Sequence, residues 1–453
     1  MPEKYDYLVI GSGPAGYVSA IRAAQLGLKV AVVEKDRNML GGVCLNEGCI
    51  PAKSLFRSAS IFNIVKRSPE LFGLEVKYKR VNMAKMVEKS RQCAEDLSKG
   101  LLFLFKKNKI DLINGKAAFR DNKTVQVEGE ERSAITVQAD KFLIAAGSTP
   151  REIPGVNFDG KKIINSSQAI RLEKVPKSIL IIGGGAIGVE FASFFNMLGS
   201  EVTIIELLDS LLPLADGEVS RRFQSIFKQR GIKVHTSSPL GEEVIKKEAH
   251  EKILVAVGRV PATSGIGLEE IGVKTDEHGY IPVDFNMRTV AENIYAAGDV
   301  LWTPMLAHAA YAEGEAAAEA AAGNQPEAID YTCVPNAVYS DVQAASVGIT
   351  EEEAKAEDLP YKTGKQLFKA SGKAVINSET EGFIKIIADD VTHKILGAHI
   401  VGSEAAELIH EFVLAKKAGL TVEEIEKTVH AHPTFSETAI DACRSVFGKP
   451  LHG

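Results

Sequence analysis

The sequence predicts an α/β fold that contains two copies of one parallel-sheet unit and ends in a smaller α+β domain. Three observations lead to this fold class. A strand, a glycine-rich turn, a helix and a second strand follow one another twice, beginning near residues 7 and 179. Each copy also has a later apolar strand that ends at a glycine, over residues 142–147 and 253–258. Residues 334–453 carry neither feature and have the short strands and helices expected of an assembly domain.

Length and composition limit the possible classes of protein. A chain of 453 residues is too long for one hydrophobic core, so several domains are expected. The net charge of -6 gives no reason to expect a nucleic-acid partner. No apolar run approaches the roughly 18 residues that a membrane span needs, and no targeting segment precedes the first strand. Five irregularly spaced cysteines argue against a secreted disulfide framework. We therefore expect a cytoplasmic protein without a membrane or nucleic-acid partner.

The first copy has the full context of a dinucleotide-binding turn. Its parts are strand 7–10, the glycines Gly11, Gly13 and Gly16, a helix over 17–26, and strand 30–33 leading into Glu34. In such a turn one glycine makes the bend, one lets the backbone approach a pyrophosphate, and one lets helix and strand pack closely. The phosphates lie at the positive end of the helix. Glu34 is placed to accept hydrogen bonds from a ribose diol.

The second copy repeats this arrangement. Its parts are strand 179–182, the glycines Gly183, Gly185 and Gly188, a helix over 189–198, and strand 202–205 leading into Glu206. The later strands of the two copies end at Gly147 and Gly258. A carboxylate at residue 206 repels a ribose 2'-phosphate, and residues 207–209 contain no basic side chain, so NAD is favoured over NADP there. The chain binds two dinucleotides, or one dinucleotide on a duplicated scaffold.

The segments around the two copies also have readable patterns. The expected elements are two amphipathic helices within 55–105, short strands over 109–137, a buried strand over 293–300, an alanine-rich helix ending at 322, strands around 337–347 and 382–388, and helices over 405–417 and 422–428. Gly419 follows the first of these last two helices as a C-cap. Residues 236–252 form a short stretch in which a hairpin fits, whereas a three-stranded meander hardly does.

Two cysteines in residues 41–53 form the first candidate reactive site. Cys44 and Cys49 lie five positions apart, and on a continuous helix that spacing puts side chains on different faces. A strained loop or a first helical turn brings the sulfurs close enough for a disulfide. A cytosolic disulfide is more often catalytic or redox-sensing than structural. Two unrelated thiols, or half of a metal site, are the alternatives.

A histidine near the C-terminus forms the second candidate site. His432 precedes Pro433, which fixes the neighbouring backbone, and Glu437 follows five residues later. A carboxylate bonded to one ring nitrogen orients the imidazole and leaves the other nitrogen free for proton transfer. A metal site made by His430 and His432 competes with this interpretation but has no obvious third ligand nearby, so no metal is predicted.

These motifs together resemble one family. Residues 41–53, both glycine turns, Gly298-Asp299, residues 305–308 and residues 432–437 are similar, in order and over nearly the whole chain, to the pyridine nucleotide-disulfide oxidoreductases. Within them the chain is most similar to the branch that oxidises dihydrolipoamide for 2-oxo acid dehydrogenase and glycine-cleavage systems. The resemblance implies FAD on the first copy, NAD on the second, and a homodimer whose active sites each take histidine and glutamate from the other subunit. It also implies a lipoylated carrier protein as partner.

The resemblance assigns roles to individual residues. Cys49 would face the flavin, Cys44 would exchange with substrate, His432 would act as base and Glu437 would orient it. Residues implied to bind FAD are Gly11, Gly13, Gly16, Glu34, Lys53, Ala117, Gly147, Asp299, Met305, Leu306, Ala307 and His308. Residues implied to bind NAD are Gly183, Gly185, Gly188, Glu190, Glu206 and Gly258, with Glu190 also paired with Lys53. The implied domains are 1–148 for FAD, 149–272 for NAD with a shortened part near 236–252, 273–333 returning to FAD, and 334–453 for dimerisation.

Other activities on the same scaffold remain to be weighed. A mercuric reductase would carry a C-terminal cysteine pair, whereas Cys443 is alone, and a large thioredoxin reductase would carry a redox-active tail. A glutathione reductase would have basic residues for NADP and a tyrosine at the position of Ala186. Two alternatives stay open. One is an NAD(P)H-dependent reductase of another disulfide, and the other is a lipoyl-carrier-binding subunit with a weakened NAD site.

Overall fold

The first sheet carries the first glycine turn and also takes up a strand from later in the chain. The computed structural model describes residues 4–67, 72–77, 80–129, 134–239, 241, 245 and 249–452. The sheet has the order β3-β2-β1-β6-β5-β4, and β14 pairs with β6. Its strands are β1 (Lys4–Ile10), β2 (Val30–Glu34), β3 (Asp111–Asn114), β4 (Lys116–Asp121), β5 (Thr124–Glu128), β6 (Ile135–Ile144) and β14 (Ile294–Ala296). Strands β1, β2, β3, β6 and β14 run parallel, which brings their carboxyl ends to one edge.

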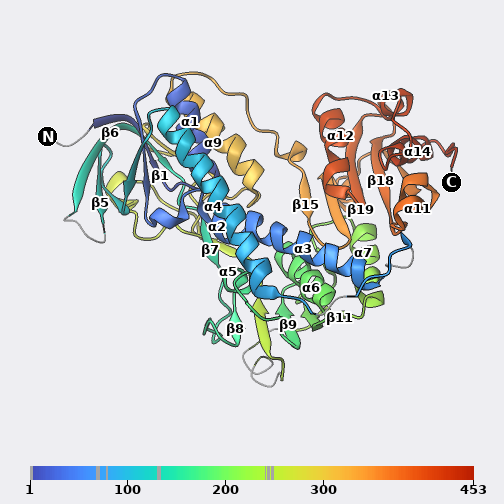
Figure 1. The fold of residues 1–453 in the computed structure, drawn as a ribbon. Helices are drawn as coiled ribbons and strands as arrows, with labels where there is room; N and C mark the ends of the chain where they lie inside the picture. Colours follow the sequence, from blue (N-terminus) through green and yellow to red (C-terminus); the bar gives the residue numbers. More distant parts are fainter. Residues whose placement is uncertain are drawn as a thin grey trace.

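Helix α1 (Pro14–Gln25) follows the first turn and packs closely on α9 (Ala307–Ala321). A Cβ on Gly314 of α9 would lie 2.3 Å from the carbonyl oxygen of Ala15, so only glycine allows this approach. Through β14 and α9 the chain therefore returns to the first sheet after forming the second one (Figure 1).

The second sheet repeats the parallel arrangement of the first. Its order is β11-β10-β9-β12-β8, with every neighbouring pair parallel. Its strands are β8 (Ile163–Ile164), β9 (Ser178–Ile182), β10 (Glu201–Ile205), β11 (Lys233–His235) and β12 (Lys252–Val255), with helices α5 (Ser166–Ala169), α6 (Ala186–Leu198) and α7 (Gly217–Gln229). Strands β7 (Ser148–Pro150) and β13 (Arg259–Pro261) pair antiparallel beside it. A hairpin was expected within 236–252, and part of that stretch, residues 240, 242–244 and 246–248, lies outside the described residues.

A helical arm joins the two sheets (Figure 1). It consists of α2 (Gly42–Glu47), α3 (Cys49–Arg67) and α4 (Met83–Lys107), so the predicted helix pair is confirmed. The first long helix begins six residues earlier than expected, at Cys49. Leu55 and Phe56 of α3 belong to the same buried core as the second sheet, which fixes the arm against it.

The C-terminal part is an antiparallel sheet covered by helices. The sheet order is β15-β16-β19-β18-β17. Its strands are β15 (Asn336–Val338), β16 (Gln343–Gly348), β17 (Tyr361–Leu367), β18 (Gly382–Asp389) and β19 (Ile395–Gly402), and its helices are α10 (Glu351–Ala356), α11 (Gly372–Asn377), α12 (Ala405–Lys417), α13 (Val422–Lys427) and α14 (Glu437–Ser445). Gly419 follows α12 with a φ of 67°, a left-handed conformation that suits glycine after a helix end. The predicted α/β fold class is confirmed.

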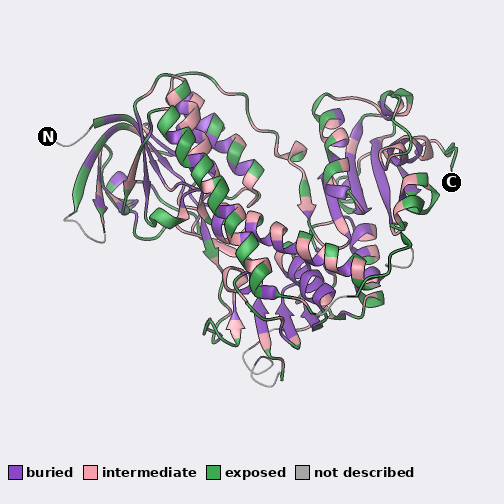
Figure 2. Cartoon of the chain, viewed as in Figure 1, coloured by how far each residue is buried: buried purple, intermediate pink, exposed green. Residues whose placement is uncertain are grey.

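Buried residues gather along the strands of the first, the second and the C-terminal sheet (Figure 2). The buried core that contains Leu55 and the second sheet also includes Phe383 and Val401 of the C-terminal sheet. Apolar packing therefore joins these two parts as well. Among the described residues no helix is long and apolar enough to cross a membrane.

Candidate active site

The two glycine turns have the same geometry. Gly11 and Gly183 have φ values of 100° and 108°, and a Cβ there would lie 2.3 and 2.4 Å from a carbonyl oxygen of the neighbouring chain segment. A Cβ on Gly16 or Gly188 would lie 1.9 Å from the carbonyl oxygen of the first glycine of its own turn. These four positions therefore need glycine because backbone approaches backbone.

The middle glycine of each turn has a different environment. A Cβ on Gly13 or Gly185 would have no neighbour within 4 Å. Both residues are helix N-caps, neither cap uses a side chain, and neither helix has an acidic residue in its first turn. The backbone N–H groups of α1 and α6 are therefore available to an anion, and open space lies beside them. Both turns fit the pyrophosphate of a dinucleotide.

The two strand-end acids brace these turns. Glu34 accepts hydrogen bonds from Ser12 N at 2.9 Å and Ser12 Oγ at 2.6 Å. Glu206 accepts from Gly184 N at 2.5 Å and Leu208 N at 2.7 Å. A carboxylate has about four lone-pair positions, so each still has acceptor capacity for a ribose hydroxyl.

A matched pair of substitutions in the second turn separates ligand binding from folding. Gly185→Ala should weaken NAD binding by at least about tenfold while the melting temperature stays near that of the wild type, because its methyl group enters only the open space. Gly188→Ala should lower the melting temperature markedly, because its methyl group collides with the backbone. Thermal unfolding and NAD titration of both variants check this. Equal NAD affinity in Gly185→Ala and the wild type would contradict the assignment of this turn.

A helix break brings the two cysteines together. Helix α2 ends at Glu47 and α3 begins at Cys49, with Gly48 between them at φ −132° and ψ −119°. A Cβ on Gly48 would lie 3.0 Å from the carbonyl oxygen of Val43, so a larger residue would push the two helices apart. The structure holds Cys44 and Cys49 as free thiols that hydrogen-bond to each other. The sequence suggested a strained loop or a first helical turn between the two cysteines, and the structure has a break between two helices there.

The two thiols differ strongly in acidity. The Cys44 hydrogen bond and the Lys53 ammonium lower the pKa of Cys49 to about 7 against the opposing effect of burial. The hydrogen bond to Cys49 and burial raise the pKa of Cys44. The pair therefore loses its first proton near neutral pH, and the charge rests on Cys49. This asymmetry suits Cys49 as the sulfur that leaves as a thiolate.

Lys53 is held beside the cysteines by a buried acid. Its Nζ lies 2.8 Å from Glu190 Oε2, and Glu190 is 6% exposed. Burial would lower the pKa of Lys53, but Glu190 outweighs it and raises that pKa, so the lysine stays charged. Glu190 also accepts from Tyr339 N at 2.8 Å. The pairing of Lys53 with Glu190 is present, and an NAD contact of Glu190 remains a prediction.

Two residues expected around FAD, Gly147 and Asp299, follow the ends of β6 and β14. Gly147 has a φ of 74°, and Asp299 accepts a hydrogen bond from Ser148 Oγ. Arg259 Nε donates to the same Ser148 Oγ at 2.6 Å and lies 3.9 Å from Asp299. Sequence reasoning missed Arg259, although it directly follows the strand-end Gly258.

The remaining expected FAD residues lie in two elements. Met305, Leu306, Ala307 and His308 lead into α9, with Leu306 as its extended N-cap. His308 Nε2 donates to the carbonyl oxygen of Pro335 at 2.7 Å, which ties this stretch to the C-terminal part. Ala117 is buried in β4, just after Gly115, whose N–H bonds to the carbonyl oxygen of Glu34 at 2.9 Å. Contacts of these residues with FAD remain predictions.

The histidine and glutamate pair forms as expected, but at a distance from the cysteines. His432 Nδ1 donates to Glu437 Oε1 at 2.8 Å, which leaves Nε2 as the basic nitrogen. Thr434 N donates to the other oxygen of Glu437 at 2.8 Å. The His432 side chain is 78% exposed, and α14, which begins five residues later, lies in the right-hand part of the molecule, apart from α2 near its middle (Figure 1). One chain therefore does not bring His432 to Cys44.

The competing metal site finds no support in the geometry. His430 Nδ1 lies 2.9 Å from the carbonyl oxygen of Thr428 and its Nε2 lies 2.8 Å from Glu411 Oε1, so both ring nitrogens have partners. Within the described part of the chain, no group of three or more His, Cys, Asp and Glu could hold a metal ion.

Two tyrosines near the cysteines were not predicted. Tyr17 of α1 donates from its hydroxyl to that of Tyr311 of α9 at 2.9 Å, and Tyr17 is half-buried whereas Tyr311 is exposed. Both interact electrostatically with Cys44. The two residues are 294 positions apart, so no local pattern could have paired them.

Comparisons with known proteins agree with this geometry. The pyridine nucleotide-disulphide oxidoreductase family matches residues 5–314, and its dimerisation domain matches residues 334–443. The dihydrolipoyl dehydrogenase of Chlorobaculum tepidum is 43% identical over 98% of each chain, and that of Bacillus subtilis is 40% identical over 100% of each. The crystal structure of LpdA from Mycobacterium tuberculosis superposes with a TM-score of 0.89 and 26% identity, over 97% of this chain and 99% of that one. The glycine turns, the cysteine pair and these matches together show that the chain belongs to the pyridine nucleotide-disulphide oxidoreductase family.

Proposed function

We propose that this chain is a dihydrolipoyl dehydrogenase, which oxidises protein-bound dihydrolipoamide and reduces NAD through Cys44 and Cys49. The observation that carries the proposal is the pair Cys44 and Cys49 at the break between α2 and α3, beside Lys53, whose Nζ lies 2.8 Å from Glu190. Relatives named dihydrolipoyl dehydrogenase, about 40% identical over nearly the whole chain, support it. The first turn with Glu34 would hold FAD and the second turn with Glu206 would hold NAD, and these groups would supply the redox chemistry that removes two electrons from the thiol pair.

The chain's own residues account for the thiol chemistry. One thiol of the substrate loses its proton to His432 and attacks Cys44 Sγ of the oxidised pair. The Cys44–Cys49 bond breaks, and Cys49 leaves as a thiolate that Lys53 stabilises. The second substrate thiol then attacks the mixed disulfide and releases the oxidised substrate. Cys44 takes up a proton, and the pair has gained two electrons.

The position of His432 requires a second subunit in this mechanism. The family's dimerisation domain matches residues 334–443, and a homodimer follows from it. The exposed His432 and Glu437 of one subunit would then serve Cys44 of the other. A lipoylated carrier protein is the partner that this substrate implies. A cytoplasmic location remains a prediction, since some relatives are named as mitochondrial.

Steady-state kinetics of the purified flavoprotein test the proposal. We expect a flavin absorption spectrum and rapid NAD reduction with dihydrolipoamide. Glutathione-type and coenzyme A-type disulfides, supplied with NADH or NADPH, serve as comparison substrates. Faster turnover of one of these disulfides than of lipoamide would replace the proposed substrate while keeping the scaffold.

One finding bears on the strength of NAD binding. The alignment with the Bacillus subtilis relative extends over 479 positions, so that protein has residues for which this 453-residue chain has no counterpart. The sequence predicts that the missing residues belong to the short stretch 236–252. Gly183, Gly185, Gly188 and Glu206 keep the geometry of the first turn, which supports retained binding. Isothermal titration without NAD binding at millimolar concentration would favour a lipoyl-carrier-binding subunit instead.

The acidity of the thiol pair predicts a pH dependence. In the reduced enzyme, alkylation of Cys49 by iodoacetamide should accelerate between pH 6 and 8 with a midpoint near 7, because the thiolate is the nucleophile. Lys53→Met should move this midpoint upward, because the ammonium that favours the thiolate is lost. Peptide mapping after timed alkylation measures both rates. A midpoint near 9 in the wild type, as for an ordinary thiol, would contradict the assigned asymmetry.

A further inference from the structure

Residues 211–216 form a short segment between β10 and α7. The N-terminal end of this segment contacts the second glycine turn. Leu212 N donates to the carbonyl oxygen of Gly184 at 2.9 Å. A Cβ on Gly184 would lie 2.7 Å from the side chain of Leu211, so the segment and the turn touch closely. Ser220 of α7 donates to the carbonyl oxygen of Leu211 and holds this end in place. Any shift of the segment would therefore reach the turn.

The second end of the segment is Asp216, which is fully buried. Its Oδ1 caps α7 by accepting from Glu218 N at 3.0 Å. Its two oxygens lie 3.1 and 2.9 Å from Nζ of Lys385, which belongs to β18 of the C-terminal sheet and is 1% exposed. The ion pair thus links the segment to the C-terminal part of the molecule.

The charges around Lys385 favour this ion pair. Lys385 also lies 2.6 Å from Glu351 and 3.4 Å from Glu218, so it faces three carboxylates. Glu218 has a second partner in Lys365, and Glu351 has one in Lys355. Among the described residues, Lys385 is the cation that forms an ion pair with Asp216. Burial would lower the pKa of Lys385, but its bonds to Glu351 and Asp216 outweigh it, so the lysine stays charged.

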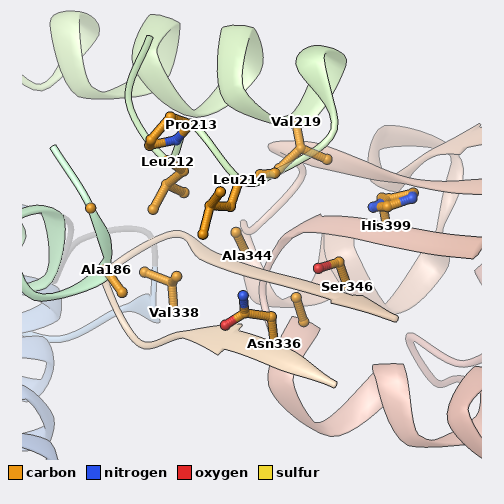
Figure 3. A pocket seen from close by; sticks show the side chains of 13 residues that line it. Ala186, Leu212, Pro213, Leu214, Val219, Asn336, Val338, Ala344, Ser346 and His399 are labelled. Carbon is orange, nitrogen blue, oxygen red and sulfur yellow. The ribbon is translucent and has the colours of Figure 1, made fainter. Parts of the chain in front are cut away.

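A cavity lies beside the middle of the segment, on the side of the C-terminal sheet. It has a volume of about 140 Å³ and lies between residues 212–215 on one side and β15 and β16 on the other (Figure 3). Leu212, Pro213 and Leu214 line one wall, and Val338, Ala344 and Ser346 line the other. Polar contacts hold the segment at both ends, at Gly184 and at Asp216.

We propose that Lys385 is a positioning residue for NAD binding. By holding Asp216, it fixes the segment 211–216 and, through Leu212 and Gly184, the turn that receives the pyrophosphate. The inference rests on the proposed placement of NAD at the second glycine turn. It adds a link between that turn and the C-terminal sheet. The link is made by Lys385, which lies 169 positions after Asp216 in the chain.

The test uses Lys385→Met in the full-length flavoprotein dimer. The substitution keeps much of the side-chain volume and leaves Asp216 without its buried cation. We expect the KM and the dissociation constant for NAD to rise roughly tenfold, as couplings of this kind do. The KM for dihydrolipoamide and the FAD content should change less than about twofold. Asp216→Asn, which keeps an acceptor for the α7 cap, should shift the NAD values in the same direction.

Controls separate positioning from general stability and from the proposed function. Lys417→Met removes an exposed ion pair with Glu327 and should leave all values unchanged. A merely structural role predicts that Lys385→Met lowers the melting temperature but leaves the KM and the dissociation constant for NAD unchanged. That result would overturn the inference. Should Lys385→Met fail to fold, unchanged NAD values in Asp216→Asn would overturn it equally. A wild-type enzyme that does not bind NAD would instead refute the proposed function.

Discussion

Replacing Cys44 or Cys49 with serine should abolish dihydrolipoamide oxidation while NADH oxidation by an artificial electron acceptor continues. Serine cannot form the disulfide that the substrate attacks, so either substitution removes the exchange step completely. The glycine turns and the acids Glu34 and Glu206 do not depend on either sulfur. Parallel assays with dihydrolipoamide and with a dye acceptor measure the two activities.

Cys93 provides the matched control for this prediction. It is half-buried, and its Sγ lies 3.6 Å from Ser54 Oγ of the same α3 that begins at Cys49. Cys93→Ser should retain both activities. Dihydrolipoamide turnover that survives in Cys44→Ser or Cys49→Ser would overturn the assignment of the redox pair. Loss of the dye activity as well would point to a damaged flavin site.

His432→Gln should slow dihydrolipoamide oxidation by roughly 100-fold or more, the usual loss when a general base is removed. Nε2 of His432 is the free nitrogen because Nδ1 donates to Glu437 at 2.8 Å. Glutamine keeps a polar side chain of similar size but cannot take a proton at neutral pH. Pre-steady-state reduction by dihydrolipoamide isolates this step, and His430→Gln is the control. An unchanged reduction rate would remove His432 from the mechanism.

Mixed dimers test whether His432 acts on the other subunit. A dimer with Cys44→Ser in one chain and His432→Gln in the other has one site with both defects and one intact site, if sites are shared. Its activity should then be about half that of the wild type. If each chain formed its own site, both sites would be defective and the mixed dimer inactive. Differently tagged subunits allow the mixed dimer to be purified.

Local sequence accounts for the turns and for most of the elements. The first and last glycines of both turns were predictable because each meets a steric demand of its own turn or adjoining strand. The buried strands β1, β9 and β12 and the helices α1, α6 and α12 follow from continuous apolar runs and periodic patterns. Strand β17 was missed because its sequence, YKTGKQL, is mostly polar. Its pairing with β18 determines its conformation, from Tyr361 opposite Asp389 to Leu367 opposite Phe383.

The sequence by itself determined the two glycine turns, the cysteine pair and the histidine–glutamate pair, because the residues of each lie within one short stretch. Only the tertiary structure decided how distant side chains meet. It placed Tyr311 against Tyr17 and Lys385 against the buried Asp216. It also placed α14, which begins at Glu437, apart from α2, which contains Cys44 (Figure 1). Such contacts depend on the packing of whole sheets and helices, and residues more than 100 positions apart leave no periodic signal of their proximity.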